Sequence, residues 1–191
     1  GRLLQRLGRE EEAAAAFESG REVDLSHGPS LIALEQLYRS AQNWSGLAEL
    51  YTSEAKRKGQ AYASWWHLRA ARVYARAENH KEAVKSFKLA TKGPLCSAHR
   101  TYQAYLIIQE SYADLAKAIE VELGHASDDD GSKAFAWYRL GQVRERHLQD
   151  PNGALKAYQK AVGFDAKALP VSEAVARVML AAGKTKQLIK F

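Results

Sequence analysis

One interval constrains the fold of this 191-residue chain more than any other feature: a small or aliphatic residue, followed four positions later by a large one, recurs about every 34 residues. The recurring positions are Ala13, Leu47, Ala83, Leu115, Ala154 and Leu188, at spacings of 34, 36, 32, 39 and 34 residues. In the first five copies the large partners are Phe17, Tyr51, Phe87, Ile119 and Tyr158. A period of this length predicts tandem structural units, each packed against its neighbours.

Each unit is predicted to be a pair of helices. The chain has only four prolines, is rich in good helix formers, and has no long run of alternating apolar and polar residues. Ahead of the recurring position lies a second apolar pattern, clearest in Trp137-x-x-Leu140-Gly141. A small residue such as Gly141 lets two helix backbones approach where they cross, and a large residue one turn away fills the adjoining space.

The Trp-x-x-Leu-Gly pattern and the period near 34 together resemble the tetratricopeptide-repeat family over nearly the whole chain. The resemblance implies an all-α fold, namely a right-handed α-solenoid of stacked antiparallel helix hairpins. We expect a single solenoid over 1–191, with hairpins at 29–58, 63–93, 97–125 and 134–166 and partial repeats at 1–26 and 169–191. Glu35 and Gln103 depart from the pattern, because the family prefers a small residue at their positions.

Both ends cut through a repeat and the chain has no starting Met, so we expect a fragment of a longer protein. Incomplete end hairpins are expected to leave Leu3, Leu4, Val175 and Met179 partly uncovered, which would permit self-association through the truncated ends. The chain has no signal peptide and no apolar stretch long enough to cross a membrane, and this favours a cytoplasmic location.

No motif for catalysis or cofactor binding occurs, so the sequence predicts neither an enzyme nor a cofactor. The three consecutive acids Asp128, Asp129 and Asp130 lack the spacing of a calcium loop, and no metal site is expected. The single cysteine, Cys96, excludes an internal disulfide.

Basic residues are divided unequally between the two helices of each predicted hairpin. The first helices (29–40, 63–77, 98–109, 134–147 and 169–181) contain nine arginines, no lysine and three acids. The second helices (9–23, 44–58, 80–92, 111–123 and 151–164) contain nine lysines, three arginines and eleven acids. The resemblance implies that first helices line a concave groove and second helices form an ordinary solvated outer face.

We therefore expect an arginine-rich groove that binds a peptide or protein surface, with an acidic surface as one option. Arginine presents a planar fork of donors that can grip a carboxylate or phosphate, and aromatic and glutamine side chains between the arginines would add anchors and backbone contacts. The candidate groove residues are Gln36, Arg39, Trp65, Arg69, Arg72, Arg76, Arg100, Phe135, Tyr138, Arg139, Gln142, Arg146 and Arg177.

Three alternatives to this groove remain open. The arginines could instead be structural, covering apolar surface or pairing with Glu35 or Glu145. The chain could be a structural or regulatory repeat segment of a larger enzyme or of a secretion or assembly machine. RNA binding by a helical repeat is disfavoured, because the basic residues are balanced by acids outside the predicted groove.

Overall fold

The computed structural model describes residues 1–23, 28–57, 60–93, 95–125, 129–165, 167 and 169–183, and these contain eleven α-helices and no strand. The prediction of an all-α fold is therefore confirmed. The chain divides into two compact units, Gly1–Ala90 and Thr91–Phe191. The sixth recurring position, Leu188, lies outside the described residues.

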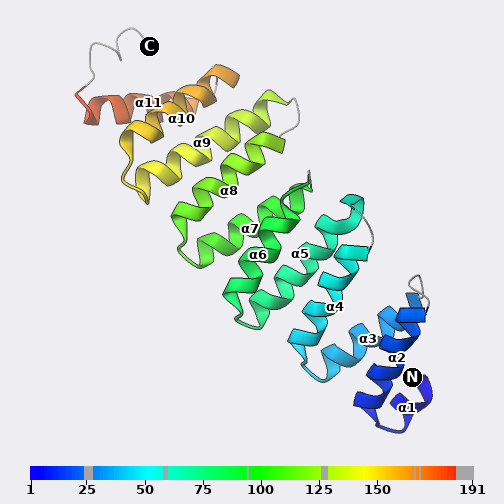
Figure 1. Cartoon of the computed structure of the whole chain (residues 1–191). Coiled ribbons are helices and arrows are strands. Elements are labelled where there is room, and N and C mark those ends of the chain that lie inside the picture. The colour runs from blue at the N-terminus through cyan, green and yellow to red at the C-terminus, as the bar shows by residue number, and fades with distance from the viewer. Residues whose placement is uncertain are drawn as a thin grey trace. The chain divides into compact units, whose positions relative to one another are not determined.

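The first unit contains six helices, in which each helix packs against its neighbours along the chain (Figure 1). They are α1 (Arg2–Arg6), α2 (Glu10–Val23), α3 (Gly28–Ser40), α4 (Trp44–Arg57), α5 (Gln60–Arg76) and α6 (His80–Ala90). Close contacts between sequential helices give a row of hairpins, whereas a bundle would bring distant helices around one centre.

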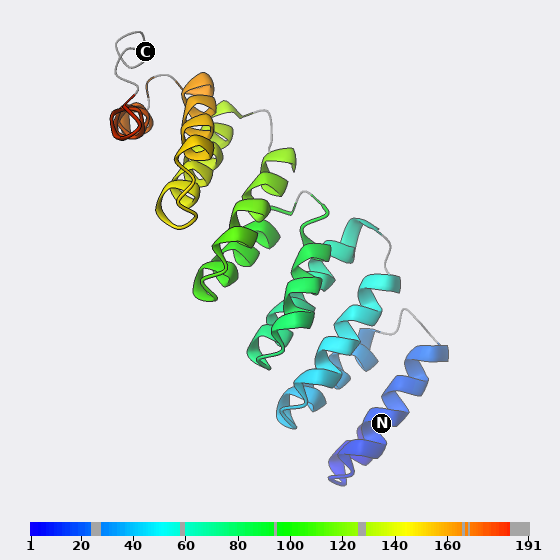
Figure 2. The same ribbon diagram turned by 60° about the vertical axis from the view of Figure 1, so that its left-hand side comes forward.

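The second unit contains five helices and follows the same rule. They are α7 (Cys96–Ile108), α8 (Tyr112–His125), α9 (Asp130–Arg146), α10 (Pro151–Phe164) and α11 (Leu169–Ala181). In this unit α7 packs on α8, α8 on α9, α9 on α10 and α10 on α11. Figure 2 shows α9 and α10 running alongside each other in opposite directions, joined by a short turn.

The hairpin turns share a backbone device that the repeat pattern did not predict. A non-glycine residue with φ between 51° and 56° ends the first helix at Gln42, Glu78, Glu110 and Gln149. The next residue begins the second helix: the Asn43 side chain accepts a hydrogen bond from the Gly46 amide at 2.9 Å, and Asp150 accepts one from the Gly153 amide at 2.8 Å. The left-handed residue ends one helix and the side-chain cap begins the next, so the reversal is short.

The recurring residues of the sequence form the core of the hairpins. All five described small or aliphatic positions are 0–2% exposed, and their large partners are 0–8% exposed. Gly141 shows why one crossing requires a small residue: a Cβ atom at this position would lie 2.4 Å from the Tyr158 ring. The small residue in the sequence pattern therefore marks the place where α9 and α10 approach closely.

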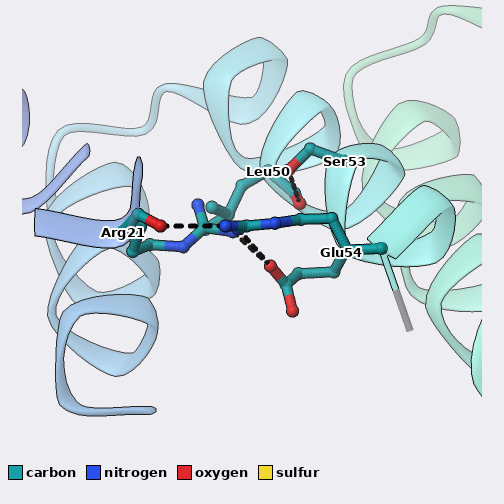
Figure 3. A network of polar contacts seen from close by, with 5 residues as sticks. Arg21, Leu50, Ser53 and Glu54 are labelled. Carbon is teal, nitrogen blue, oxygen red and sulfur yellow. Dashed lines mark hydrogen bonds and ion pairs between the residues drawn. The ribbon is translucent and has the colours of Figure 1, made fainter. Parts of the chain in front are cut away.

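A buried ion cluster links α2 to α4 (Figure 3). Arg21 pairs with Glu54, and these residues are 7% and 2% exposed. Arg57 contacts the same carboxylate at 3.0 Å and donates a hydrogen bond to the Arg21 carbonyl oxygen at 2.9 Å. The expectation of an ordinary solvated surface on the second helices is wrong here, because these charges are buried and satisfy one another.

The expectation about the truncated C-terminal end is also wrong for two residues. Val175 and Met179 on α11 are 0% and 2% exposed, because both pack in a core cluster with Ala154 and Tyr158 of α10. Leu3 at the other end is 69% exposed, as expected. A single helix packed on α10 is therefore enough to bury its own apolar face.

We predict that Gly141→Ala lowers the free energy of unfolding by about 1–3 kcal/mol, because the added methyl group would overlap the Tyr158 ring. The matched control is Gly163→Ala on α10, where nothing lies within 4 Å of the added carbon. This change is expected to be neutral or to stabilise the helix by up to about 1 kcal/mol. Urea denaturation measures both effects, and equal effects would contradict the crossing argument.

Candidate functional site

Three helices of the first unit bring arginine and aromatic side chains to one place. On α5, Arg69, Arg72 and Arg76 are three and four residues apart and therefore share a helix face. The neighbouring helix α4 contributes Trp44 at its first turn and Tyr51 two turns later. Residues seven positions apart on a helix lie on the same side, so both rings face the same space.

These side chains line a pocket of about 270 Å³, which we call the arginine pocket. Its lining consists of Arg39, Trp44, Leu47, Tyr51, Arg69, Arg72, Val73 and Arg76, and none of these described residues is acidic. Four of the thirteen predicted groove residues, all of them arginines, thus meet in one cavity. Unpaired anionic groups would be attracted to it.

Tyr51 connects the packing of the hairpin to this pocket. Its ring is 1% exposed and belongs to the core of the first unit. Its hydroxyl oxygen accepts hydrogen bonds from Arg39 Nη2 at 3.2 Å and from Arg69 Nη2 at 2.8 Å. A buried repeat residue therefore fixes two guanidinium groups from two different first helices, α3 and α5.

Arg69 and Arg76 are further positioned by aromatic rings. The Arg69 guanidinium carbon lies 4.2 Å from the Tyr51 ring centroid and 4.8 Å from that of Trp65. That of Arg76 lies 4.3 Å from the Trp44 ring centroid. Stacking on an aromatic face holds a guanidinium in place while its N–H edge can still donate hydrogen bonds.

Two neighbouring side chains, the carboxylate of Glu35 and the phenol of Tyr51, affect the charge of the pocket. Arg69 Nη2 forms an ion pair with Glu35 Oε2 at 3.0 Å, across α5 and α3. The hydrogen bond to Tyr51 is the main reason why the pKa of Arg39 is raised above its usual value. The hydrogen bond to Tyr51 thus favours the charged form of Arg39, and Glu35 partly offsets the charge of Arg69.

A larger cavity in the same unit has a different character. It encloses about 530 Å³ between α2, α3 and α4. Its lining mixes the carboxylates Glu18, Glu22 and Glu49 with the cations Arg21 and Arg57. The three carboxylates outnumber the two cations, so this cavity lacks the positive excess of the arginine pocket's lining.

In the second unit, two of the four predicted groove arginines, Arg139 and Arg177, form ion pairs with carboxylates of the chain. Arg139 contacts Glu122 at 3.6 Å and donates a hydrogen bond to the amide oxygen of Gln103, which is 1% exposed. Gln103 also donates a hydrogen bond to Glu122 at 2.8 Å. The polar residue at a position where the family prefers a small one is therefore satisfied by charged neighbours.

Arg177 is likewise paired with a carboxylate, and the position of that carboxylate in its hairpin allows a comparison with the first unit. Its Nε and Nη2 atoms donate to the two oxygens of Glu145 at 3.0 and 2.8 Å, and Tyr158 donates to the same carboxylate at 2.6 Å. Glu145 follows Leu140 by five residues, as Arg39 follows Leu34 in the first unit. The two hairpins share this arrangement. In the second unit Glu145 neutralises Arg177, whereas in the first unit Arg39 adds a positive charge at the position equivalent to Glu145.

The remaining predicted groove residues are distributed over both units. Gln36 is exposed on α3 outside the arginine pocket, and Trp65, which is 45% exposed, packs edge-on against Trp66. In the second unit, Arg100 and Phe135 line a cavity of about 350 Å³ together with Arg139. Gln142 and Arg146 line another cavity, of about 340 Å³, and Tyr138 packs against Tyr158.

The sequence analysis missed Trp44 and the polar role of Tyr51. The repeat pattern assigned Tyr51 only to packing, and it gave Trp44 no role beyond following a predicted turn. Their separation of seven residues on a helix was the available signal, since it places both rings on the face that carries the repeat residues. The pairing of Arg69 with Glu35 and of Arg177 with Glu145 agrees with the alternative in which some arginines are structural.

The described residues form tandem antiparallel hairpins with large residues packed at their crossings, which is an α-helical repeat fold of the kind found in tetratricopeptide-repeat proteins. No family model and no curated protein matches the chain by sequence.

Several solved structures are similar to this chain. The C-terminal part of a TPR repeat-containing protein from Cytophaga hutchinsonii matches 97% of this chain and 71% of its own at 12% identity, with a TM-score of 0.49. A MamA chain from Desulfovibrio magneticus matches 93% and 90% at 17% identity, with a TM-score of 0.45. A thermophilic TPR protein from Thermus thermophilus matches 93% and 94% at 15% identity, with a TM-score of 0.41. At such identities and scores, these proteins carry no argument about what this chain binds.

Two further observations apply to the part of the chain that the structure describes. None of its helices combines the length and the apolar character needed to cross a membrane. No group of three or more histidine, cysteine, aspartate or glutamate side chains there is arranged to hold a metal ion.

We predict that Glu145→Gln destabilises the second unit by about 1 kcal/mol at pH 7 and that this cost shrinks as the pH falls through the lowered pKa of Glu145. The hydrogen bond from Arg177, followed by that from Tyr158, lowers the pKa of Glu145 against the opposing effect of burial. A lowered pKa stabilises the fold above the unfolded value of about 4.3, and this stabilisation is lost as the pH falls through the folded pKa.

Denaturant unfolding from pH 7 to pH 3 measures this difference. The matched control is Glu173→Gln on the exposed surface of α11, which should change stability by less than about 0.5 kcal/mol throughout. A cost for Glu145→Gln that stays constant with pH would show that the ion pair is not its source.

Proposed function

We propose that this protein is a protein-interaction scaffold whose first unit binds an acidic segment of a partner in the arginine pocket. The observation that carries the proposal is the convergence of Arg39, Arg69, Arg72 and Arg76 on a cavity with no acidic residue in its lining. An acidic side chain placed there would meet several guanidinium forks at once.

The contacts around the pocket also fit recognition of a peptide. Trp44, Leu47 and Val73 provide apolar wall beside the charges, and an interface anchor requires both kinds of contact. Trp65 is 45% exposed next to Arg69 and offers a second apolar contact. A row of hairpins suits this role, since successive first helices present adjacent stretches of surface to an extended ligand.

The second unit explains why the proposal concerns the first. Arg177 and Arg139 already bond to Glu145 and Glu122, so a ligand would have to displace carboxylates of the chain itself. Arg39 donates a hydrogen bond to the Tyr51 hydroxyl, and a neutral hydroxyl does not cancel its charge. The same hairpin geometry thus supports an internal ion pair in one unit and an anion site in the other.

The test uses a fluorescent octapeptide of glutamate, an octapeptide of lysine and an oligouridylate of eight nucleotides. We predict that the whole chain binds the glutamate peptide in preference to both other probes. Arg39→Glu should weaken this binding by at least about tenfold, because a glutamate there would pair with Arg69 as Glu145 pairs with Arg177.

Lys117→Glu is the control for the change in net charge. Lys117 is 75% exposed on α8 of the second unit, and its replacement should leave the affinity for the glutamate peptide within about twofold. Circular dichroism checks that both variants stay helical. Equal loss in the two variants, or tighter binding to the oligouridylate than to the peptide, would refute the proposal.

A further inference from the structure

We infer that the group held in the arginine pocket is a phosphoryl group on a phosphorylated serine or threonine of the partner. This inference rests on the proposed function and specifies its ligand. It is carried by three features of the pocket: its charge, the placement of its hydrogen-bond donors, and its walls.

The charge of the pocket exceeds what one carboxylate would balance. Arg39, Arg69 and Arg76 contribute three guanidinium groups, and Glu35 is the carboxylate paired with one of them. These four residues alone leave an excess of two positive charges. A phosphorylated side chain carries about −1.5 to −2 charges at pH 7, whereas a glutamate or aspartate carries one.

The donors are held so that several can reach one group. Arg69 uses the same atom, Nη2, for its bonds to Glu35 and to Tyr51, and Arg39 bonds to Tyr51 through its own Nη2. These two guanidinium groups therefore meet at one tyrosine oxygen. Stacking of Arg76 on Trp44 fixes a third guanidinium in the same lining. A phosphoryl group offers three strong acceptor oxygens to such an array, and a carboxylate offers two.

The walls favour a phosphorylated peptide over a nucleic acid or lipid surface. Val73 provides apolar contact beside the guanidinium groups, where the Cβ of serine or the methyl group of threonine would pack. A backbone with many phosphates requires an extended basic surface. Here the larger cavity of the same unit carries Glu18, Glu22 and Glu49, and these would repel it.

The experiment compares two degenerate peptide libraries that differ only at a fixed central residue, phosphoserine in one and glutamate in the other. Fluorescence polarisation with the whole chain measures both affinities at physiological salt. We expect the phosphoserine library to bind at least about tenfold more tightly. Arg76→Lys should reduce this preference to about threefold or less, because lysine keeps the charge and loses the planar fork.

Arg6→Lys on α1 is the control, since it makes the same change at an exposed arginine outside the arginine pocket and should leave the preference intact. Equal binding of the two libraries, with both weakened by Arg39→Glu, would overturn the phosphoryl inference and leave the proposed function standing. Binding of neither library would overturn both. Tighter binding to vesicles containing phosphoinositide or to an oligouridylate than to the phosphoserine library would also overturn the inference.

Discussion

The structure depends on the close approach of two helices at the hairpin crossings, where a large residue of the second helix packs against the first helix. The contact between Gly141 and Tyr158 shows how tight this fit is. When the ring is a tyrosine, its hydroxyl reaches the first-helix side and bonds to charged residues there, as Tyr51 and Tyr158 both do. The residue that fills the crossing therefore also orders the polar face, and packing and recognition share one side chain.

The repeat period made the fold predictable, because small and large residues at one interval have few other physical explanations. The period did not reveal the left-handed residues Gln42, Glu78, Glu110 and Gln149, since no glycine marks these turns. It also did not reveal which charges would be buried. Arg21 and Glu54 belong to second helices that have an ordinary mixed composition, and only the tertiary contact between α2 and α4 removes them from water.

The candidate site was predictable in part, and the missing part has a simple physical source. Arg39, Arg69, Arg72 and Arg76 were identified from the distribution of arginine, but their partners are set by packing between hairpins. These partners nevertheless carry a signal: Glu35 and Arg69 are 34 residues apart, and Glu145 and Arg177 are 32 apart. Opposite charges separated by about one period belong to equivalent parts of adjacent hairpins, and a search for such pairs would have identified both ion pairs, including that of Arg69, which also lines the arginine pocket.

Under the proposed function, the two units put one architecture to different uses. A glutamate five residues after the buried leucine, at Glu145, neutralises the neighbouring arginine, whereas an arginine at the equivalent position, Arg39, leaves positive charge on the face of the first unit. The most direct test is nuclear magnetic resonance of the arginine Nε–Hε groups during titration with phosphoserine. The account predicts that the signals of Arg39, Arg69 and Arg76 shift together and that those of Arg139 and Arg177 stay in place. Shifts spread over the arginines of both units, or confined to the second, would contradict it.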